Sequence, residues 1–178
     1  KFDNVIIDQN SGSCDTIHYG PNIDTIAQCH DLTWHKNTSC PMTMIGNNDL
    51  EIHGSLDLDD YVNLQSQKVL FRSSDMGETI KTGNITFKGD VVFNGDGGWS
   101  LQDSLKREND TAKKKAKISF KKGNLNTNGQ YITTPRFWSQ DTNSRVLTLD
   151  SSTIDVWQDS SWIVKQDPLT VNPGSSQI

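Results

Sequence analysis

The acidic stretch from Asp57 to Asp60 holds the carboxylates of this sequence that are best placed for chemistry. In a strand, alternate residues point to the same side, so Asp57 and Asp59 share an outward face about 7 Å apart. Carboxylate oxygens are the ligands that Ca²⁺ prefers. The spacing predicts a candidate calcium site at Asp57 and Asp59, and a charged exterior that keeps the chain soluble is the simpler interpretation.

Basic residues gather in one segment. From Lys106 to Lys122 there are eight basic and two acidic residues, a local charge of +6, so the rest of a chain of net charge −5 carries −11. A binding site for an acidic glycan would use lysines 113–115 of this segment with tryptophans as platforms for sugar rings. A solvated corner insertion, with the tryptophans packed in the core, is the simpler interpretation. Nucleic acid is not an expected partner, because phosphate contact needs a broad positive face. The candidate binding residues are Lys113, Lys114, Lys115, Trp99 and Trp138.

The three cysteines, Cys14, Cys29 and Cys40, all lie in the first quarter of the chain. They form no CxxC pair, which argues against a structural zinc site. One disulfide with one thiol left over is the simpler interpretation. Cys29 and Cys40 would enclose a short loop, although the sequence alone does not fix the pairing. Zinc ligation by Cys29, His30, His35 and Cys40 is the alternative.

Catalytic motifs are absent from the sequence: it has no GxSxG, HExxH, P-loop or dinucleotide fingerprint. The residues of a catalytic triad come together in space rather than in sequence, so the absence of these motifs alone does not exclude an enzyme. We expect no enzymatic activity and no cofactor except possible calcium. A polysaccharide lyase-like activity is the main enzymatic alternative, and it would need acids and a base on one face of adjacent turns.

The composition predicts an all-β chain with many corners. At 178 residues it suits one domain or one elongated unit. Hydrophobic residues make up 33%, which is low for a parallel α/β sheet buried on both sides. Alanine is scarce, whereas residues that favour turns are plentiful. No stretch approaches the roughly 18 apolar residues of a membrane span, so no transmembrane segment is expected.

Four segments share one pattern of two short alternating runs joined by a polar corner: 49–58, 83–95, 117–129 and 145–157. If Ile52, Ile85, Ile118 and Leu147 are equivalent, they recur with a period of roughly 30 residues, which is typical of stacked repeats. The pattern predicts a right-handed parallel β-helix with three short strands per turn. Stacked coils of this period would fill 46–178, after a Cys-containing segment at 1–45. An antiparallel β-sandwich is the competing fold.

The same pattern predicts a narrow core and the positions of the corners. Asn94-Gly95 and Asn128-Gly129 are expected at equivalent corners of successive coils rather than in hairpins. The residues expected to point inward are Leu50, Ile52, Leu56, Leu58, Ile85, Phe87, Val91, Phe93, Ile118, Phe120, Leu147, Leu149, Ile154 and Val156.

The sequence also resembles a known class of repeats. "ITFKGDVVFNGDGGWSLQDSL" and "KGNLNTNGQYITTPRFWSQDTNSRVLTLDSSTIDV" resemble the repeat regions of large surface and secreted proteins of Bacteroidota, gliding- and adhesin-like proteins exported by the type IX route. Upstream, "AQCHDLTW" and "LEIHGSLDL" resemble the segments that precede those repeats. The resemblance covers most of the chain from Cys29 onward. The insert "KRENDTAKKKAK" and the pair Pro135-Arg136 depart from the pattern.

The resemblance implies that 1–178 is one solenoid unit, a segment of a longer repeat protein, located at the cell surface or secreted. Its expected function is that of a non-enzymatic structural or adhesion module that presents loops from a stiff solenoid. A carbohydrate-binding or polysaccharide-degrading β-helix protein is one alternative, and a self-assembling filament or sheath subunit is another. The expected partners are a glycan or other cell-surface ligand, and neighbouring copies or adjacent repeats of the same protein.

Overall fold

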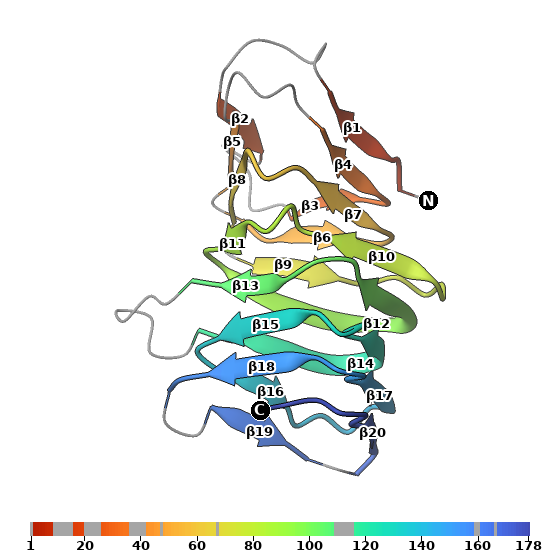
Figure 1. Ribbon diagram of the computed structural model, residues 1–178. Coiled ribbons are helices and arrows are strands. Elements are labelled where there is room, and N and C mark those ends of the chain that lie inside the picture. Colours follow the sequence, from red (N-terminus) through yellow and green to blue (C-terminus); the bar gives the residue numbers. More distant parts are fainter. Residues whose placement is uncertain are drawn as a thin grey trace.

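The strands stack as a parallel β-solenoid of about six turns (Figure 1). This computed structural model describes residues 2–8, 16–19, 26–35, 42–46, 48–66, 68–108, 116–158, 161–165 and 167–178. All pairs between the named strands in these residues are parallel. The predicted β-helix is therefore confirmed, and the antiparallel sandwich is wrong.

Three faces, named A, B and C here, surround the core. Face A contains β3 (Ala27–Cys29), β6 (Leu50–Ile52), β9 (Lys68–Phe71), the first halves of β12 (Asp90–Leu101) and β14 (Ile118–Asn126), β16 (Phe137–Ser139) and β19 (Trp162–Val164). Face B contains β1 (Val5–Ile7), β4 (Leu32–Trp34), β7 (Leu56–Leu58), β10 (Glu78–Lys81), the second halves of β12 and β14, β17 (Arg145–Thr148) and β20 (Leu169–Asn172). Face C contains β2 (Thr16–Tyr19), β5 (Met42–Gly46) and β8 (Val62–Gln65), followed by β11 (Thr86–Phe87), β13 (Leu105–Arg107), β15 (Tyr131–Thr134) and β18 (Thr153–Val156).

The core follows the alternation of the sequence. All of the predicted inward residues are buried except Val156, which is half-buried against the core. On face A, Phe71 and Phe93 stack with their ring centroids 5.1 Å apart, and Phe120 meets Phe93 edge-on at 6.5 Å. Such aromatic pairs add stability beyond the burial of their area. A thin core of stacked ladders explains why so few apolar residues suffice.

The turns are shorter and less regular than the sequence predicts. Along face A, strand register links Val69, Val91, Ile118 and Phe137 in succession. The steps between them are 22, 27 and 19 residues, which are unequal and shorter than the predicted period. The predicted coil length is wrong because the residues taken as equivalent lie on different faces. Ile118 belongs to face A, whereas Leu147 belongs to face B. Corners of unequal length hide the true period.

The glycine-rich stretch 95–98 is where β12 bends from face A to face B. A Cβ at Gly95 would press on the carbonyl group of Ser73 in the preceding turn. Gly123 in the next turn has φ of +85°, and a Cβ there would lie 2.5 Å from the Gly97 carbonyl oxygen. Successive backbones thus touch directly at this corner. Asn128-Gly129 instead lies between β14 and β15 at the corner of faces B and C, so the predicted equivalence of the two Asn-Gly corners is wrong.

A buried hydroxyl pair holds the corner between faces B and C, and it gives a first prediction. Thr127 Oγ1 lies 2.6 Å from Ser152 Oγ and 3.0 Å from the Leu149 carbonyl oxygen. Thr127→Val keeps the shape and removes the hydroxyl, so the buried Ser152 hydroxyl loses this partner. We expect the free energy of unfolding in urea to fall by about 1.5 kcal/mol. The exposed Thr170→Val should leave it unchanged, and equal effects of the two variants would contradict this role.

Candidate functional site

The outer side of face A carries three rows of side chains along the solenoid axis. From β9 onward the central row is Leu70, Val92, Ser119, Trp138 and Ile163, joined by strand register, and Gln28 and Glu51 precede Leu70 in the same row. One flanking row, two residues earlier in each strand, is Lys68, Asp90, Lys117, Arg136 and Ser161. The other consists of the residues two positions later in the chain, Arg72, Asn94, Lys121, Gln140 and Lys165, although Asn94 itself pairs in register with Lys122. A largely apolar row therefore lies between two rows rich in basic residues.

Alternation within the strands produces this arrangement. Val69 and Phe71 point into the core, so Leu70 between them points outward, and the same holds for Val92. Leu70 and Val92 are outside the core cluster yet only 8% and 7% exposed. Long basic side chains can lay their apolar stems over such a row while their charged ends stay in water. The result is a flat, partly desolvated surface with positive charge on both sides.

Trp138 is the aromatic residue of this surface. It lies at the centre of β16, between Ser119 of β14 and Ile163 of β19, and it is half-buried. The Lys117 ammonium lies 5.2 Å from the centroid of its ring, a cation–π contact. Of the tryptophans in the prediction, Trp138 thus keeps an outward position beside positive charge.

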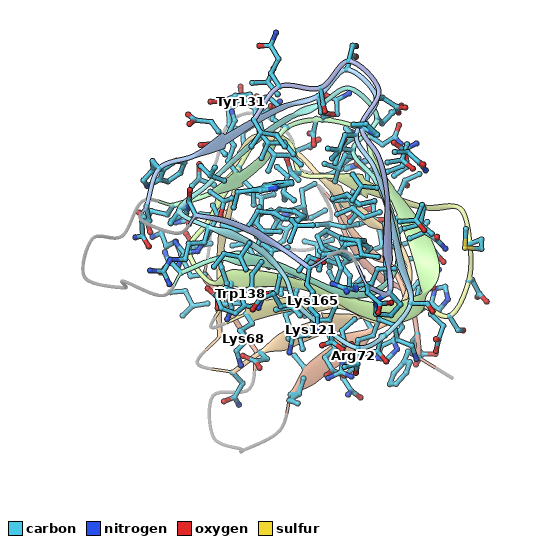
Figure 2. The ribbon with its side chains drawn as sticks, turned by 90° about the horizontal axis from the view of Figure 1, so that it is seen from below. Lys68, Arg72, Lys121, Tyr131, Trp138 and Lys165 are labelled. Carbon is cyan, nitrogen blue, oxygen red and sulfur yellow. The ribbon has the colours of Figure 1, made fainter. Side chains whose placement is uncertain are left out.

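The charges of face A set it apart from the acidic remainder of the chain. Figure 2 shows Lys68, Arg72, Lys121, Trp138 and Lys165 on one side of the solenoid, with Tyr131 on the opposite side. Lys68 and Arg72 form ion pairs with Asp49 at 3.0 Å and with Glu51 at 2.7 Å. Lys121 and Lys165 are exposed, and neither forms an ion pair with another described residue. These two ammonium groups are free to contact an anion.

Lys121 lies in its row because it follows Ser119 by two residues, and it also lies at a β-bulge. Phe93 pairs with Phe120, but the next residue, Asn94, pairs with Lys122, so Lys121 is the extra residue of β14. Bulges commonly redirect a side chain at a functional position. Nothing in the local sequence pattern predicts this bulge. Arg72 and Lys165 also could not be assigned to the site from local sequence, because they join it through the register of distant turns.

The structure corrects one predicted binding residue and leaves three outside its description. Trp99 is 2% exposed and packs against Phe71 and Phe93 with centroids 6.2 and 5.7 Å apart. It faces inward because β12 continues through the glycines, which places Trp99 and the buried Leu101 on the same side of the strand. The expectation that Trp99 offers a sugar platform is wrong. Lys113, Lys114 and Lys115 lie outside the described residues.

The predicted calcium ligands already have partners. Asp57 Oδ1 accepts a hydrogen bond from Lys81 Nζ at 2.9 Å, and its Oδ2 lies 2.8 Å from His35 Nε2. Burial raises the pKa of Asp57, but the hydrogen bonds from His35 and Lys81 outweigh it, so the net pKa is lowered. A calcium ion at Asp57 would have to displace Lys81. The calcium site at Asp57 and Asp59 stays a prediction.

Cys29 and the histidines near it do not share a zinc site. Cys29 is 3% exposed within the core cluster, and burial, with a smaller contribution from Asp31, raises the pKa of its thiol to about 11. His35 instead contacts Asp57, and His30 lies beside Asp31 at the corner. Zinc ligation that combines Cys29, His30 and His35 is therefore wrong. Cys29 is a free thiol here, and its predicted disulfide partner, Cys40, lies outside the described residues.

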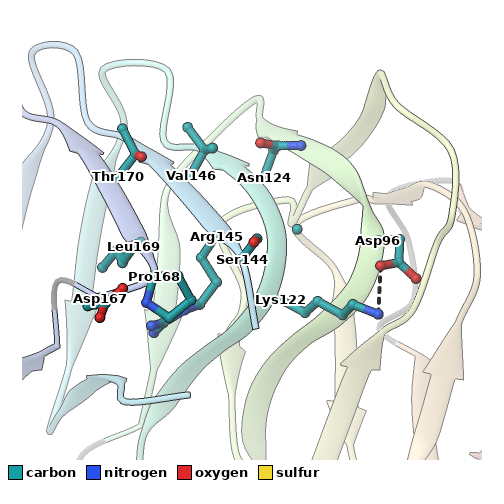
Figure 3. A pocket seen from close by; sticks show the side chains of 11 residues that line it. Asp96, Lys122, Asn124, Ser144, Arg145, Val146, Asp167, Pro168, Leu169 and Thr170 are labelled. Atoms are coloured by element: carbon teal, nitrogen blue, oxygen red, sulfur yellow. Dashed lines mark ion pairs between the residues drawn. The ribbon is translucent and has the colours of Figure 1, made fainter. Parts of the chain in front are cut away.

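A hollow of about 700 Å³ opens on the outer side of face B, at its corner with face A (Figure 3). Lys122 Nζ and Asp96 Oδ1 form an ion pair of 2.6 Å at its rim. Arg145 lines it but is 2% exposed, and its guanidinium donates to Ser139 Oγ and to the Asp141 carbonyl oxygen at 2.6 and 2.7 Å. These charged side chains of the hollow are thus already bonded within the fold. The basic surface of face A remains the better candidate site.

No protein family, curated protein or solved structure matches this chain. The resemblance to surface repeat proteins of Bacteroidota, and the place of the chain within a longer repeat protein, therefore stay predictions. The described residues contain no helix that could span a membrane.

Proposed function

We propose that this chain is a non-enzymatic binding module that holds an anionic polysaccharide along the outer side of face A. The observation that carries the proposal is the position of Trp138 in a largely apolar row, with the Lys117 ammonium against its ring. Lys121 and Lys165, which form no ion pair with a described residue, lie in the adjoining row.

The chemistry of the three rows suits a charged sugar chain. An aromatic ring can stack on the apolar side of a sugar, while basic side chains pair with carboxylate or sulfate groups. Asn94 and Gln140, in the row of Lys121, add amide groups that can hydrogen-bond hydroxyls. Neighbouring strands lie about 4.8 Å apart, so a ligand lying across them meets a new set of side chains at every turn.

The charge distribution favours a polysaccharide over a nucleic acid. The whole chain carries −5, whereas from β9 onward the three rows of face A hold six basic residues and one acidic residue. A nucleic acid carries dense charge along its whole length and would be repelled by the acidic faces. A flexible glycan with spaced charges can follow a single face.

We propose binding rather than cleavage because the described carboxylates of face A are committed to other groups. Asp49 pairs with Lys68, and Glu51 pairs with Arg72. Asp90 accepts a hydrogen bond from the Lys117 backbone at 3.1 Å. A general acid or base would need a carboxyl group free to exchange a proton with the ligand.

The wider role that we propose is adhesion at a cell surface or in a secreted matrix. A solenoid held by continuous ladders presents face A as a stiff surface, and a polysaccharide spanning several turns makes many weak contacts at once. Such contacts add through effective concentration.

A double variant tests the proposal. In affinity electrophoresis against a polyuronate such as polygalacturonate, Lys121→Gln with Lys165→Gln should weaken binding about tenfold at low salt and flatten its salt dependence. The matched control, Lys81→Gln with Lys106→Gln, makes the same change of charge on faces B and C and should have little effect. Equal losses in both pairs would mean that only net charge matters, and the proposed site would be wrong.

A further inference from the structure

Three successive corners between faces A and B bring a histidine and two carboxylates together. His30 follows β3, while Asp75 and Glu78 belong to the loop and strand that follow β9, two turns further on. One potential ligand atom from each of these three residues lies within 4.8 Å of the other two. The cluster lies outside the proposed glycan surface, because none of its residues belongs to the three rows of face A.

The histidine is held in place by its neighbours. Asp31 Oδ1 lies 3.1 Å from His30 Nδ1, which can fix the ring so that Nε2 is available. A carboxylate on the second nitrogen is the usual companion of a histidine that binds metal. Gly54, at the corner one turn on, makes room for this pair. A Cβ there would come 2.8 Å from His30 Nδ1 and would also clash with the Asp31 carboxylate.

The Glu78 carboxylate is held by hydroxyl groups. Ser55 Oγ donates to Glu78 Oε2 at 2.6 Å, and Ser73 Oγ lies 3.3 Å from Glu78 Oε1. Ser73 Oγ also accepts a hydrogen bond from the Asp75 backbone at 2.9 Å, which ties the loop down. Two residues from neighbouring corners thus orient Glu78.

We propose that His30, Asp75 and Glu78 bind a divalent transition metal of the zinc class. One imidazole nitrogen and two carboxylate oxygens suit Zn²⁺, and three protein ligands leave its fourth position for water. Ca²⁺ fits poorly, because it takes six to eight oxygen ligands. The bound ion joins the loop after β9 to the corner two turns earlier, so it clamps three turns of the solenoid. This inference does not depend on the proposed glycan function.

The test uses the full chain and Zn²⁺ alone, titrated in competition with a chromophoric zinc chelator. We expect one site per chain and a higher melting temperature when Zn²⁺ is present, because an ion that binds only the folded state stabilises it. The double variant His30→Gln with Asp75→Asn should lose this site, with affinity at least about 100-fold weaker, and Asp31→Asn should weaken it about tenfold. Millimolar Ca²⁺ should not compete.

The matched control is Asp96→Asn, which removes an exposed carboxylate at the same kind of corner one turn further on. It should bind Zn²⁺ as the unchanged chain does. Circular dichroism of the double variant without metal separates a lost site from a lost fold, because His30 and Asp75 are not core residues. No stoichiometric binding, or binding that survives in the double variant, would overturn the proposal.

Discussion

Gly123→Ala is expected to lower the free energy of unfolding by at least about 3 kcal/mol, through backbone strain and a backbone clash together. The φ of +85° at Gly123 is unfavourable for any residue with a Cβ. The added methyl group would also lie 2.5 Å from the Gly97 carbonyl oxygen and would press on that of Gly95. Both oxygens belong to the backbone of the previous turn, so relief requires the two turns to separate.

Gly77→Ala is the matched control for this prediction. Gly77 has nearly the same φ, +88°, but a Cβ there would meet nothing within 4 Å. It should therefore lose only the conformational part, about 1–2 kcal/mol. Urea unfolding of both variants, followed by circular dichroism, measures the difference. If the two losses are equal, the close stacking of glycine corners does not govern stability.

Trp138→Ala should weaken binding of an acidic polysaccharide about 30-fold, the loss typical of a central aromatic anchor. Its side chain points out of the solenoid, so the fold should persist. The variant removes both the stacking platform and the partner of the Lys117 ammonium. Isothermal titration calorimetry with a uronate oligomer measures the change.

Trp157→Ala serves as the control for the aromatic contribution. Trp157 is 37% exposed and directly follows β18 of face C, so it lies outside the three rows of the proposed site. It should bind the oligomer with unchanged affinity. If Trp157→Ala weakens binding and Trp138→Ala does not, the ligand lies on another face.

The sequence predicts the fold well because strand alternation is a local property. Alternation with their immediate neighbours predicts that Phe93 and Phe120 point inward, and their burial confirms this. The turn length is instead a property of distant pairing, and corners of different size make the successive turns of face A unequal. The period is therefore harder to predict than the strands themselves.

The same difference between local alternation and distant pairing explains which site residues the sequence predicts and which it misses. Trp138 is predicted from its residue type, and its outward position follows from the buried Phe137 beside it. The prediction for Trp99 fails because a glycine corner resembles a break in the chain, whereas β12 runs through it as one strand. Lys121 and Lys165 become neighbours of Trp138 only through the register of distant turns, which no local pattern shows.

The central claim is that face A holds an acidic polysaccharide, and a titration of the ¹⁵N-labelled chain with a uronate oligomer tests it most directly. The account predicts that the Trp138 indole signal and the amide signals of 117–121, 136–140 and 163–165 shift together and saturate, and that high salt reverses the shifts. Shifts confined to face B or C, or no saturable shift at low salt, would contradict it.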